Sequence, residues 1–92
     1  MKNYEDMSDG ELSFQVHLVW NNIPEGYATI STFDINNPSD IMPIAIENGI
    51  SLIFIQRNVW EASDGGVKVA IHDENPYRSI AICFLKMKDT EK

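Results

Sequence analysis

The chain is 92 residues long, with 43% hydrophobic and 23% charged residues and a net charge of −7 at pH 7. This balance is typical of one small folded domain and excludes an intrinsically disordered chain. The negative charge disfavours direct binding to nucleic acid or to an anionic membrane. The only cysteine, Cys83, excludes an internal disulfide and, inside an apolar run, indicates a buried reduced thiol.

The charge is distributed unevenly along the chain. No lysine or arginine occurs from Asn3 to Gln56, a stretch with eight carboxylates, whereas residues 57–92 hold six basic and six acidic groups. The net charge therefore belongs to residues 1–56, and we expect that side of the molecule to face a basic protein surface. The densest acidic patch lies near the start and comprises Glu5, Asp6, Asp9 and Glu11.

The first predicted element is a helix that begins at Asp9. Ser8 and Glu11 have the spacing of a capping box, in which each side chain accepts from the other residue's backbone N–H. Residues 12–20 fit both a strand alternation and a helical stripe of apolar residues. We favour the helix because its start signal is specific.

A short strand is expected over residues 27–33, after a turn at residues 24–26. The dipeptide Asn-Pro then occurs twice, at Asn37-Pro38 and at Asn75-Pro76. Asparagine is a favoured N-cap and proline suits the first helical position, so both dipeptides predict helix starts.

A proline interrupts the helical pattern that follows Pro38. Pro43 would remove a hydrogen bond and clash with the preceding turn, so we expect a short turn over residues 39–42 and a new helix from Pro43. Gly49 is placed to end that helix in a left-handed conformation.

Three strands and a helix complete the chain. Residues 50–56 form the most hydrophobic stretch and are expected to be a central strand, with apolar side chains on both faces. Residues 59–62 and 67–71 flank the glycine-rich segment 63–66 and predict a hairpin. The last helix should run from Pro76 to about Lys88.

This order predicts a single α+β domain over residues 1–92, with a mainly antiparallel sheet of about four strands and three helices packed on it. The polar ends, at about 1–6 and 89–92, are expected to fray. The start of the chain has no signal-peptide pattern, and the apolar runs are too short to span a bilayer, so we expect a cytoplasmic protein without a membrane partner.

No group of residues in the sequence has the spacing of a catalytic or cofactor site. His17 and His72 are far apart and lie in no metal-ligand motif. Cys83 lacks the electropositive, partly exposed setting of a reactive thiol. Gly65 and Gly66 lack the lysine and the helix of a phosphate-binding loop. We therefore expect no enzyme, no cofactor and no catalytic residue.

Two alternatives involve charged groups. Four acidic residues next to the Asn-Pro dipeptides could bind Mg²⁺ or Ca²⁺ if their loops meet, although capping explains them better: Asp34, Asp40, Asp73 and Glu74. Five basic residues could contact nucleic acid, but few aromatic residues lie among them: Arg57, Lys68, Arg78, Lys86 and Lys88. We expect no metal and no direct nucleic-acid binding.

The two tryptophans, Trp20 and Trp60, are the other candidates. Tryptophan is enriched at the centres of protein interfaces, although either side chain could equally fill the core.

Four segments carry a family resemblance: residues 4–12, 36–52, 60–62 and 75–87, with the two Asn-Pro blocks and the sequence Glu47-Asn48-Gly49-Ile50-Ser51 between them. Together these segments resemble the NinX-like family of small proteins from lambdoid phages and prophages. The resemblance implies a phage or prophage origin and expression inside a bacterial host. It carries over no catalytic residue.

The sequence thus favours a non-enzymatic accessory protein that binds a protein partner through its acidic side. A nucleic-acid mimic directed against a host protein is an alternative, but eight carboxylates over 54 residues are sparse beside the charge density of DNA. A metal-dependent enzyme and a factor in phage DNA metabolism are further alternatives. The oligomeric state and the partner's identity stay open.

Overall fold

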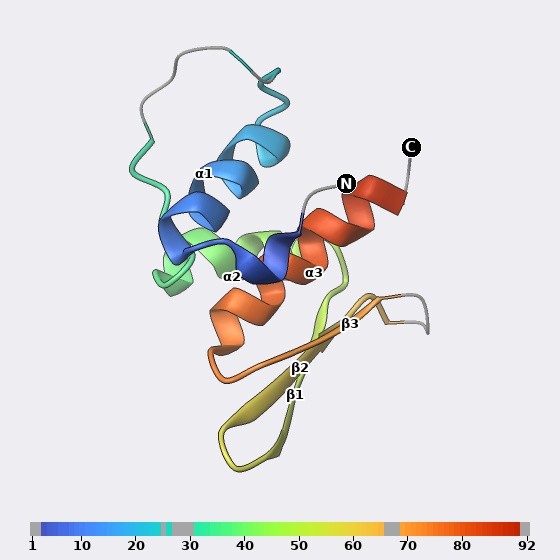
Figure 1. Cartoon of the computed structure of the whole chain (residues 1–92). Helices are drawn as coiled ribbons and strands as arrows, with labels where there is room; N and C mark the ends of the chain where they lie inside the picture. Colours follow the sequence, from blue (N-terminus) through green and yellow to red (C-terminus); the bar gives the residue numbers. More distant parts are fainter. Residues whose placement is uncertain (1–2, 25, 27–30, 66–68, 91–92) are drawn as a thin grey trace.

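The computed structural model describes residues 3–24, 26, 31–65 and 69–90 (Figure 1). The elements follow the order η1 Tyr4–Asp6, α1 Asp9–Trp20, α2 Pro38–Glu47, β1 Ser51–Gln56, β2 Val59–Ser63, β3 Ala70–Asp73 and α3 Pro76–Thr90. The strands form an antiparallel sheet in the order β1-β2-β3. The predicted α+β class is confirmed, with three strands in the described residues where about four were expected.

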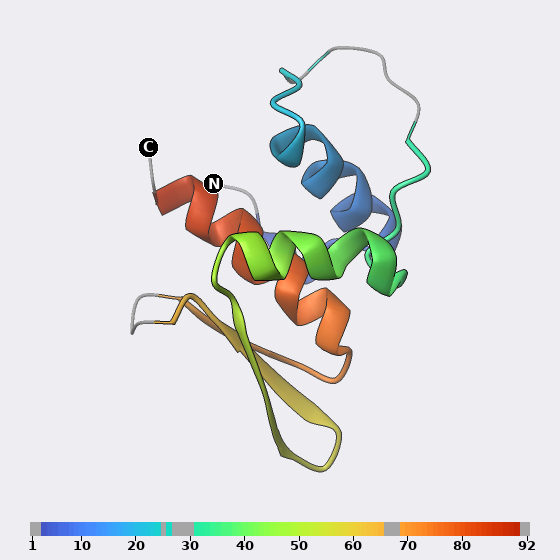
Figure 2. The ribbon, with the colours of Figure 1, turned by 180° about the vertical axis from the view of Figure 1, so that it is seen from behind.

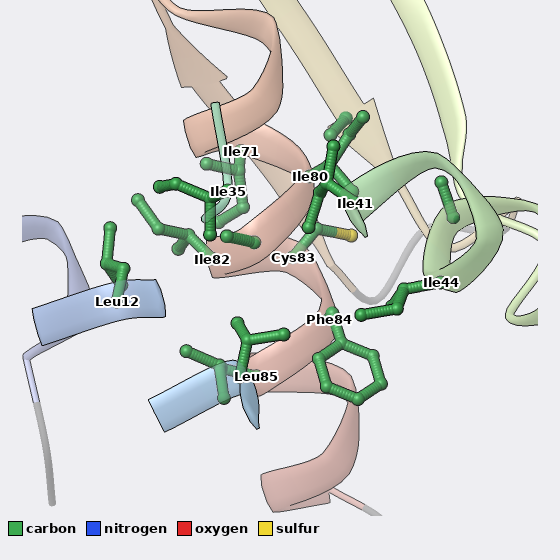
Figure 3. Close-up of a cluster of buried hydrophobic side chains, with 14 of the residues drawn as sticks. Leu12, Ile35, Ile41, Ile44, Ile71, Ile80, Ile82, Cys83, Phe84 and Leu85 are labelled. Atoms are coloured by element: carbon green, nitrogen blue, oxygen red, sulfur yellow. The ribbon is translucent and has the colours of Figure 1, made fainter. Parts of the chain in front are cut away.

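Helix α3 lies at the centre of the fold. It packs against β2 and β3 on one side and against α1 and α2 on others, so that α1 and α2 pack mainly on α3 and not directly on the sheet. Seven consecutive residues, Ser79–Leu85, are buried, because a helix covered on all sides needs more than one apolar stripe. Figure 3 shows Phe84 of α3 close to Ile44 of α2 in this core.

The predicted start of α1 is confirmed in detail. The backbone N–H of Glu11 donates to Oγ of Ser8 (3.1 Å), and the backbone N–H of Ser8 donates to Oε1 of Glu11 (3.0 Å). Residues 12–20 are helical, as favoured. The helix ends with Asn22 at a φ of 56°, and the N–H of Ile23 donates to the carbonyl of Leu18 (2.8 Å).

Both Asn-Pro dipeptides begin helices, as predicted. Oδ1 of Asn37 accepts from the N–H of Ser39 (3.0 Å), and Oδ1 of Asn75 accepts from the N–H of Tyr77 (2.9 Å). Pro38 and Pro76 are the first residues of α2 and α3. Each proline sits where the absent N–H would have had no partner within the helix.

The prediction that Pro43 starts a new helix is wrong. Helix α2 is continuous from Pro38 to Glu47, with Pro43 inside it. Proline costs a helix interior about 3 kcal/mol, but Pro43 is exposed while Ile41 and Ile44 on either side are fully buried. The burial of these two side chains offsets the cost of the missing hydrogen bond.

The predicted end of α2 at Gly49 is confirmed. Gly49 has a φ of 65°, a conformation that glycine adopts without strain. The N–H of Ile50 donates to the carbonyl of Ala45 (2.9 Å), and the N–H of Gly49 donates to that of Ile46 (3.3 Å). These are the two bonds of a Schellman motif.

The strand predicted over residues 27–33 does not form where the structure describes it. Residues 31–33 are irregular, and residues 27–30 lie outside the described part. The nearby Ile35 is fully buried, and its N–H donates to Oγ of Ser13 (3.0 Å), so this segment is attached to α1 and not to the sheet.

The prediction that the most hydrophobic strand is central is also wrong. β1 is an edge strand of the described sheet, and five of its six residues are exposed. An apolar run with side chains on both faces does not require a strand on each side. The predicted pairing of the next two strands is confirmed, although β3 begins at Ala70 and part of the predicted loop lies outside the described residues.

The two ends of the chain contact each other where they are described. Tyr4 is only 4% exposed, and its hydroxyl donates to Oδ2 of Asp89 (2.6 Å), whereas residues 1–6 and 89–92 were expected to fray. Tyr4 joins the core because its ring is large and apolar. Among the described residues, no helix is long and apolar enough to cross a membrane.

Candidate functional site

The structure gives each residue of the predicted acidic patch a partner within the chain. Oε1 of Glu5 lies 2.7 Å from Nζ of Lys86, and Oδ2 of Asp6 accepts from the side-chain amide of Asn3 (2.7 Å). Glu11 caps α1, and Asp9 pairs with Arg78. The basic residues missing from the first part of the sequence are thus supplied by α3.

Arg78 is the centre of this arrangement. Its side chain is only 16% exposed. Nη1 donates to Oδ1 of Asp9 (2.9 Å), Nη2 donates to the backbone carbonyl of Glu5 (2.8 Å), and Nε lies 3.2 Å from Oδ2 of Asp73. One guanidinium therefore ties α3 to the start of the chain, to α1 and to the end of β3.

The two Asn-Pro blocks meet beside this guanidinium. The side-chain amide of Asn75 donates to Oδ1 of Asn36 (2.7 Å), and the amide of Asn36 donates to Oδ2 of Asp9 (3.0 Å). The hydrogen bond from Asn36 and the nearby Arg78 charge hold the pKa of Asp9 below its usual value. We call these residues, with Glu5 and Asp73, the Arg78 network.

The acidic residues near the Asn-Pro blocks do not gather around a cation site. Oδ2 of Asp40 accepts from the backbone N–H of Asp34 (3.0 Å), and Oδ1 of Asp73 accepts from that of Asn75 (2.9 Å). Within the described ranges, no three His, Cys, Asp or Glu side chains form a group that could hold a metal ion. Asp40 and Asp73 thus bond to backbone N–H groups in the loops before α2 and α3, whereas the helix caps are Asn37 and Asn75.

Two other candidates are placed inside the fold. Cys83 is fully buried, as predicted, and burial raises the pKa of its thiol to about 11. Trp20 packs edge-on against Phe84, with 6.1 Å between ring centroids, and so belongs to the rim of the core. Cys83 is thus enclosed by the core, whereas Trp20 is only partly buried.

The five basic residues do not form a shared surface where they are described. Arg78 and Lys86 are held by carboxylates, and Nζ of Lys88 lies 5.7 Å from the centroid of the Phe84 ring. Arg57 is at the tip of the β1–β2 hairpin, while Lys68 lies outside the described residues.

The β1–β2 hairpin extends beyond the helices, as Figures 1 and 2 show from opposite sides. Arg57 and Asn58 connect its strands with φ angles of 49° and 66°, the left-handed conformation of a tight two-residue turn. Phe54 pairs with Trp60 across the hairpin, and their rings meet edge to face at a centroid distance of 5.0 Å. This aromatic pair lies outside the main hydrophobic core.

Three consecutive apolar side chains of β1 are exposed. The exposed fraction is 50% for Ile53, 52% for Phe54 and 45% for Ile55. Scattered exposed apolar residues are ordinary, but contiguous ones mark binding surfaces. We call Ile53, Phe54, Ile55 and Trp60 the β1 edge surface.

The exposed side chains lie on both faces of β1: Phe54 and Trp60 share the face of Leu52, at the end of the hairpin near its turn, and Ile53 lies on the opposite face. Leu52, Ala62 and Ile71 lie opposite one another and face α3. Ile53 follows Leu52 in β1, so its side chain lies on the opposite face, in a row with Glu61 and His72. Oε1 of Glu61 lies 2.9 Å from Nε2 of His72. No described helix packs on that face (Figure 2).

The two edges of the described sheet differ in protection. β3 has four residues and carries His72 and Asp73, and short, charged edges resist further pairing. β1 has six residues and no charged side chain. Its one irregularity is a bulge between Phe54 and Gln56.

Ile53, Phe54 and Ile55 were not among the predicted site residues, because the most apolar strand was expected to be central in the sheet. The two-residue link with Asn58 predicts a tight hairpin, which pairs β1 with β2 on one side. No other described segment pairs with β1 on its other side, so β1 is an edge strand. Trp60 was identified as an interface candidate and lies beside these residues.

No protein-family model matches this chain, and neither a curated protein nor a solved structure matches it.

Proposed function

We propose that this chain is a non-enzymatic protein-binding module that contacts its partner through the β1 edge surface. The observation that carries the proposal is the exposure of three consecutive large apolar side chains on an uncharged sheet edge. The buried core around α3 forms without Ile53, Phe54 and Ile55, so the packing of that core does not require these three to be apolar.

Binding would use two physical features of β1. An edge strand presents backbone N–H and C=O groups that can pair with a strand from another chain. Burial of Ile53, Phe54 and Trp60 would supply the hydrophobic contribution, and aromatic side chains are enriched among the residues that dominate binding energy.

The acidic patch is a second candidate surface for a basic partner. Its ion pairs are partly exposed, with side-chain exposures of 50% for Glu5 and 44% for Asp9, and exposed pairs contribute only about 0–1 kcal/mol. A basic partner could therefore displace them. We rank the β1 edge surface above the acidic patch as the binding site, because binding there would not break an ion pair within the chain.

We propose a bacterial cytoplasm as the setting and a phage or prophage accessory role as the context. The resemblance of the Asn-Pro blocks to NinX-like proteins supports the context, and the single buried thiol supports a reducing compartment.

Affinity capture from a bacterial lysate tests the proposal, with the wild type, Ile53→Lys and Phe14→Lys compared. Lysine at 53 faces Glu61 on β2, so we expect the sheet to tolerate it. Phe14, on α1 and 40% exposed, is the matched control. We expect Ile53→Lys alone to lose the captured protein.

Loss of capture with Phe14→Lys and not with Ile53→Lys would move the interface to the acidic side. In that case capture should also weaken as salt is raised, because exposed charge contacts are screened.

A further inference from the structure

We infer that a second copy of this chain is the partner of β1, so that two molecules pair along this strand and their sheets become continuous. The inference rests on the proposed function, since it takes the β1 edge surface as the contact and names what covers it.

The sequence of β1 is suited to pairing with a copy of itself. The strand reads Ser51-Leu52-Ile53-Phe54-Ile55-Gln56, with a polar residue at each end and four apolar residues between them. None of these six side chains is charged, so a strand that covers β1 should be apolar and uncharged along its centre, and a second β1 is both.

Two-fold symmetry restricts the register in which two β1 strands can pair. Residues opposite each other in antiparallel strands point to the same face of the sheet. A two-fold axis between two residues would pair each residue with its sequence neighbour, which points to the other face. The axis must therefore pass through one residue, which faces its own copy. An axis at Ile53 places Ile53 against Ile53 of the second copy. Leu52 then lies opposite Phe54 of the second copy, on the face that Leu52 shares with Ala62.

The charges close to β1 are compatible with this pairing. Each copy carries −7, which opposes association, yet β1 has no charged residue. If the register with its axis at Ile53 continues beyond β1, Arg57 lies opposite Gly49 of the second copy, two residues after Glu47 at the end of α2. The side chains of Arg57 and Glu47 are exposed, and neither has an ion-pair partner among the described residues. The pairing thus brings opposite charges to the same end of the paired strands.

Sedimentation equilibrium of the full chain tests the inference over protein concentrations that rise into the millimolar range. We expect the wild type and Phe14→Lys to approach twice the monomer mass of 10.5 kDa. Ile53→Lys should remain a monomer, because two ammonium groups would meet on the axis. A monomeric wild type, or an Ile53→Lys variant that associates equally well, would overturn the inference.

Disulfide cross-linking tests the register. Under mild oxidation, Ile53→Cys should form a covalent dimer faster than Phe54→Cys, because only position 53 faces itself within reach of a disulfide. The native Cys83 is buried, with its pKa raised to about 11, and should not compete. Faster cross-linking at position 54 would refute the axis at Ile53.

The two proposals can fail separately. If the wild type stays monomeric while Ile53→Lys alone loses a captured lysate protein, the second copy is refuted and the protein-binding function stands. If the chain neither associates nor loses any partner on substitution at Ile53, both proposals fall.

Discussion

The Arg78 network and the β1 edge surface are opposite outcomes of the same folding problem. In the Arg78 network, charged groups far apart in the sequence are brought together, and the guanidinium has acceptors on Asp9, Asp73 and Glu5. On β1, apolar side chains that could have been buried remain half exposed. The charged groups of the first region have partners within the chain, whereas the proposed function has another molecule cover the second region.

The Arg78 network shows that the distribution of charge along the sequence does not predict the distribution of charge on the folded surface. The first 56 residues carry all the net charge, but Arg78 and Lys86 from α3 pair with Asp9 and Glu5. An exposed apolar strand is the stronger indication of function, because burial within the chain would have been the simpler outcome.

The largest expected effect separates buried from exposed aromatic residues. Phe84 is fully buried, and Phe84→Ala should lower the free energy of unfolding by about 3–5 kcal/mol or abolish cooperative melting. Phe54→Ala removes a half-exposed ring and one aromatic contact, so we expect a loss of about 1 kcal/mol or less. Urea denaturation measures both. Equal losses would mean that Phe54 is a structural residue.

Removal of the central guanidinium should give the next largest effect. Arg78→Met leaves Asp9 and Asp73 without their cation, and we expect a loss of about 2–3 kcal/mol in the urea-derived stability. Lys86→Met is the matched control, because it breaks a more exposed pair with Glu5 and should cost about 0–1 kcal/mol. Similar losses of stability for both variants would show that Arg78 contributes no more to the fold than an exposed ion pair does.

The capping box of α1 gives a smaller effect. Ser8→Ala removes the side-chain acceptor for the N–H of Glu11, and thermal unfolding should report a loss of about 1 kcal/mol. Ser39→Ala, at an exposed position inside the first turn of α2, should be close to neutral. A neutral Ser8→Ala variant would show that the box does not contribute to the start of α1.

The smallest expected effect is a pH dependence at Asp9. Its folded-state pKa is lowered, so it contributes stability above its ordinary pKa of 3.8, and this contribution disappears as pH falls through the folded value. Asp9→Asn should be less stable than the wild type at neutral pH, and the gap should narrow below pH 3.8. Urea midpoints at several pH values measure the gap. A constant gap would contradict this account.

Local signals in the sequence predicted local structure well. The Ser8 cap, the two Asn-Pro starts and the Gly49 end each depend on a few neighbouring residues, and all are present in the structure. Pro43 was misread because the burial of Ile41 and Ile44, which keeps α2 continuous, depends on contacts with distant elements. The same reason applies to β1, whose place in the sheet depends on strand order.

The candidate site was only partly accessible from the sequence. Trp60 stood out by residue type, but its partner Phe54 is identified by the hairpin register, which places the two rings 5.0 Å apart. The acidic patch was visible, but the hydrogen bonds that occupy Asp9 join residues up to 69 positions apart. Periodicity and composition carry no information on such distant pairs.

Photo-cross-linking in bacterial cells tests the central claim most directly. The photoreactive benzoylphenylalanine would replace Phe54 on β1 in one variant and Phe14 on α1 in the other, two phenylalanines that are 52% and 40% exposed. The account predicts a discrete covalent adduct, with a second copy or another protein, from position 54 and none from position 14. An adduct from position 14 alone, or from neither position, would contradict the claim that β1 is the binding surface.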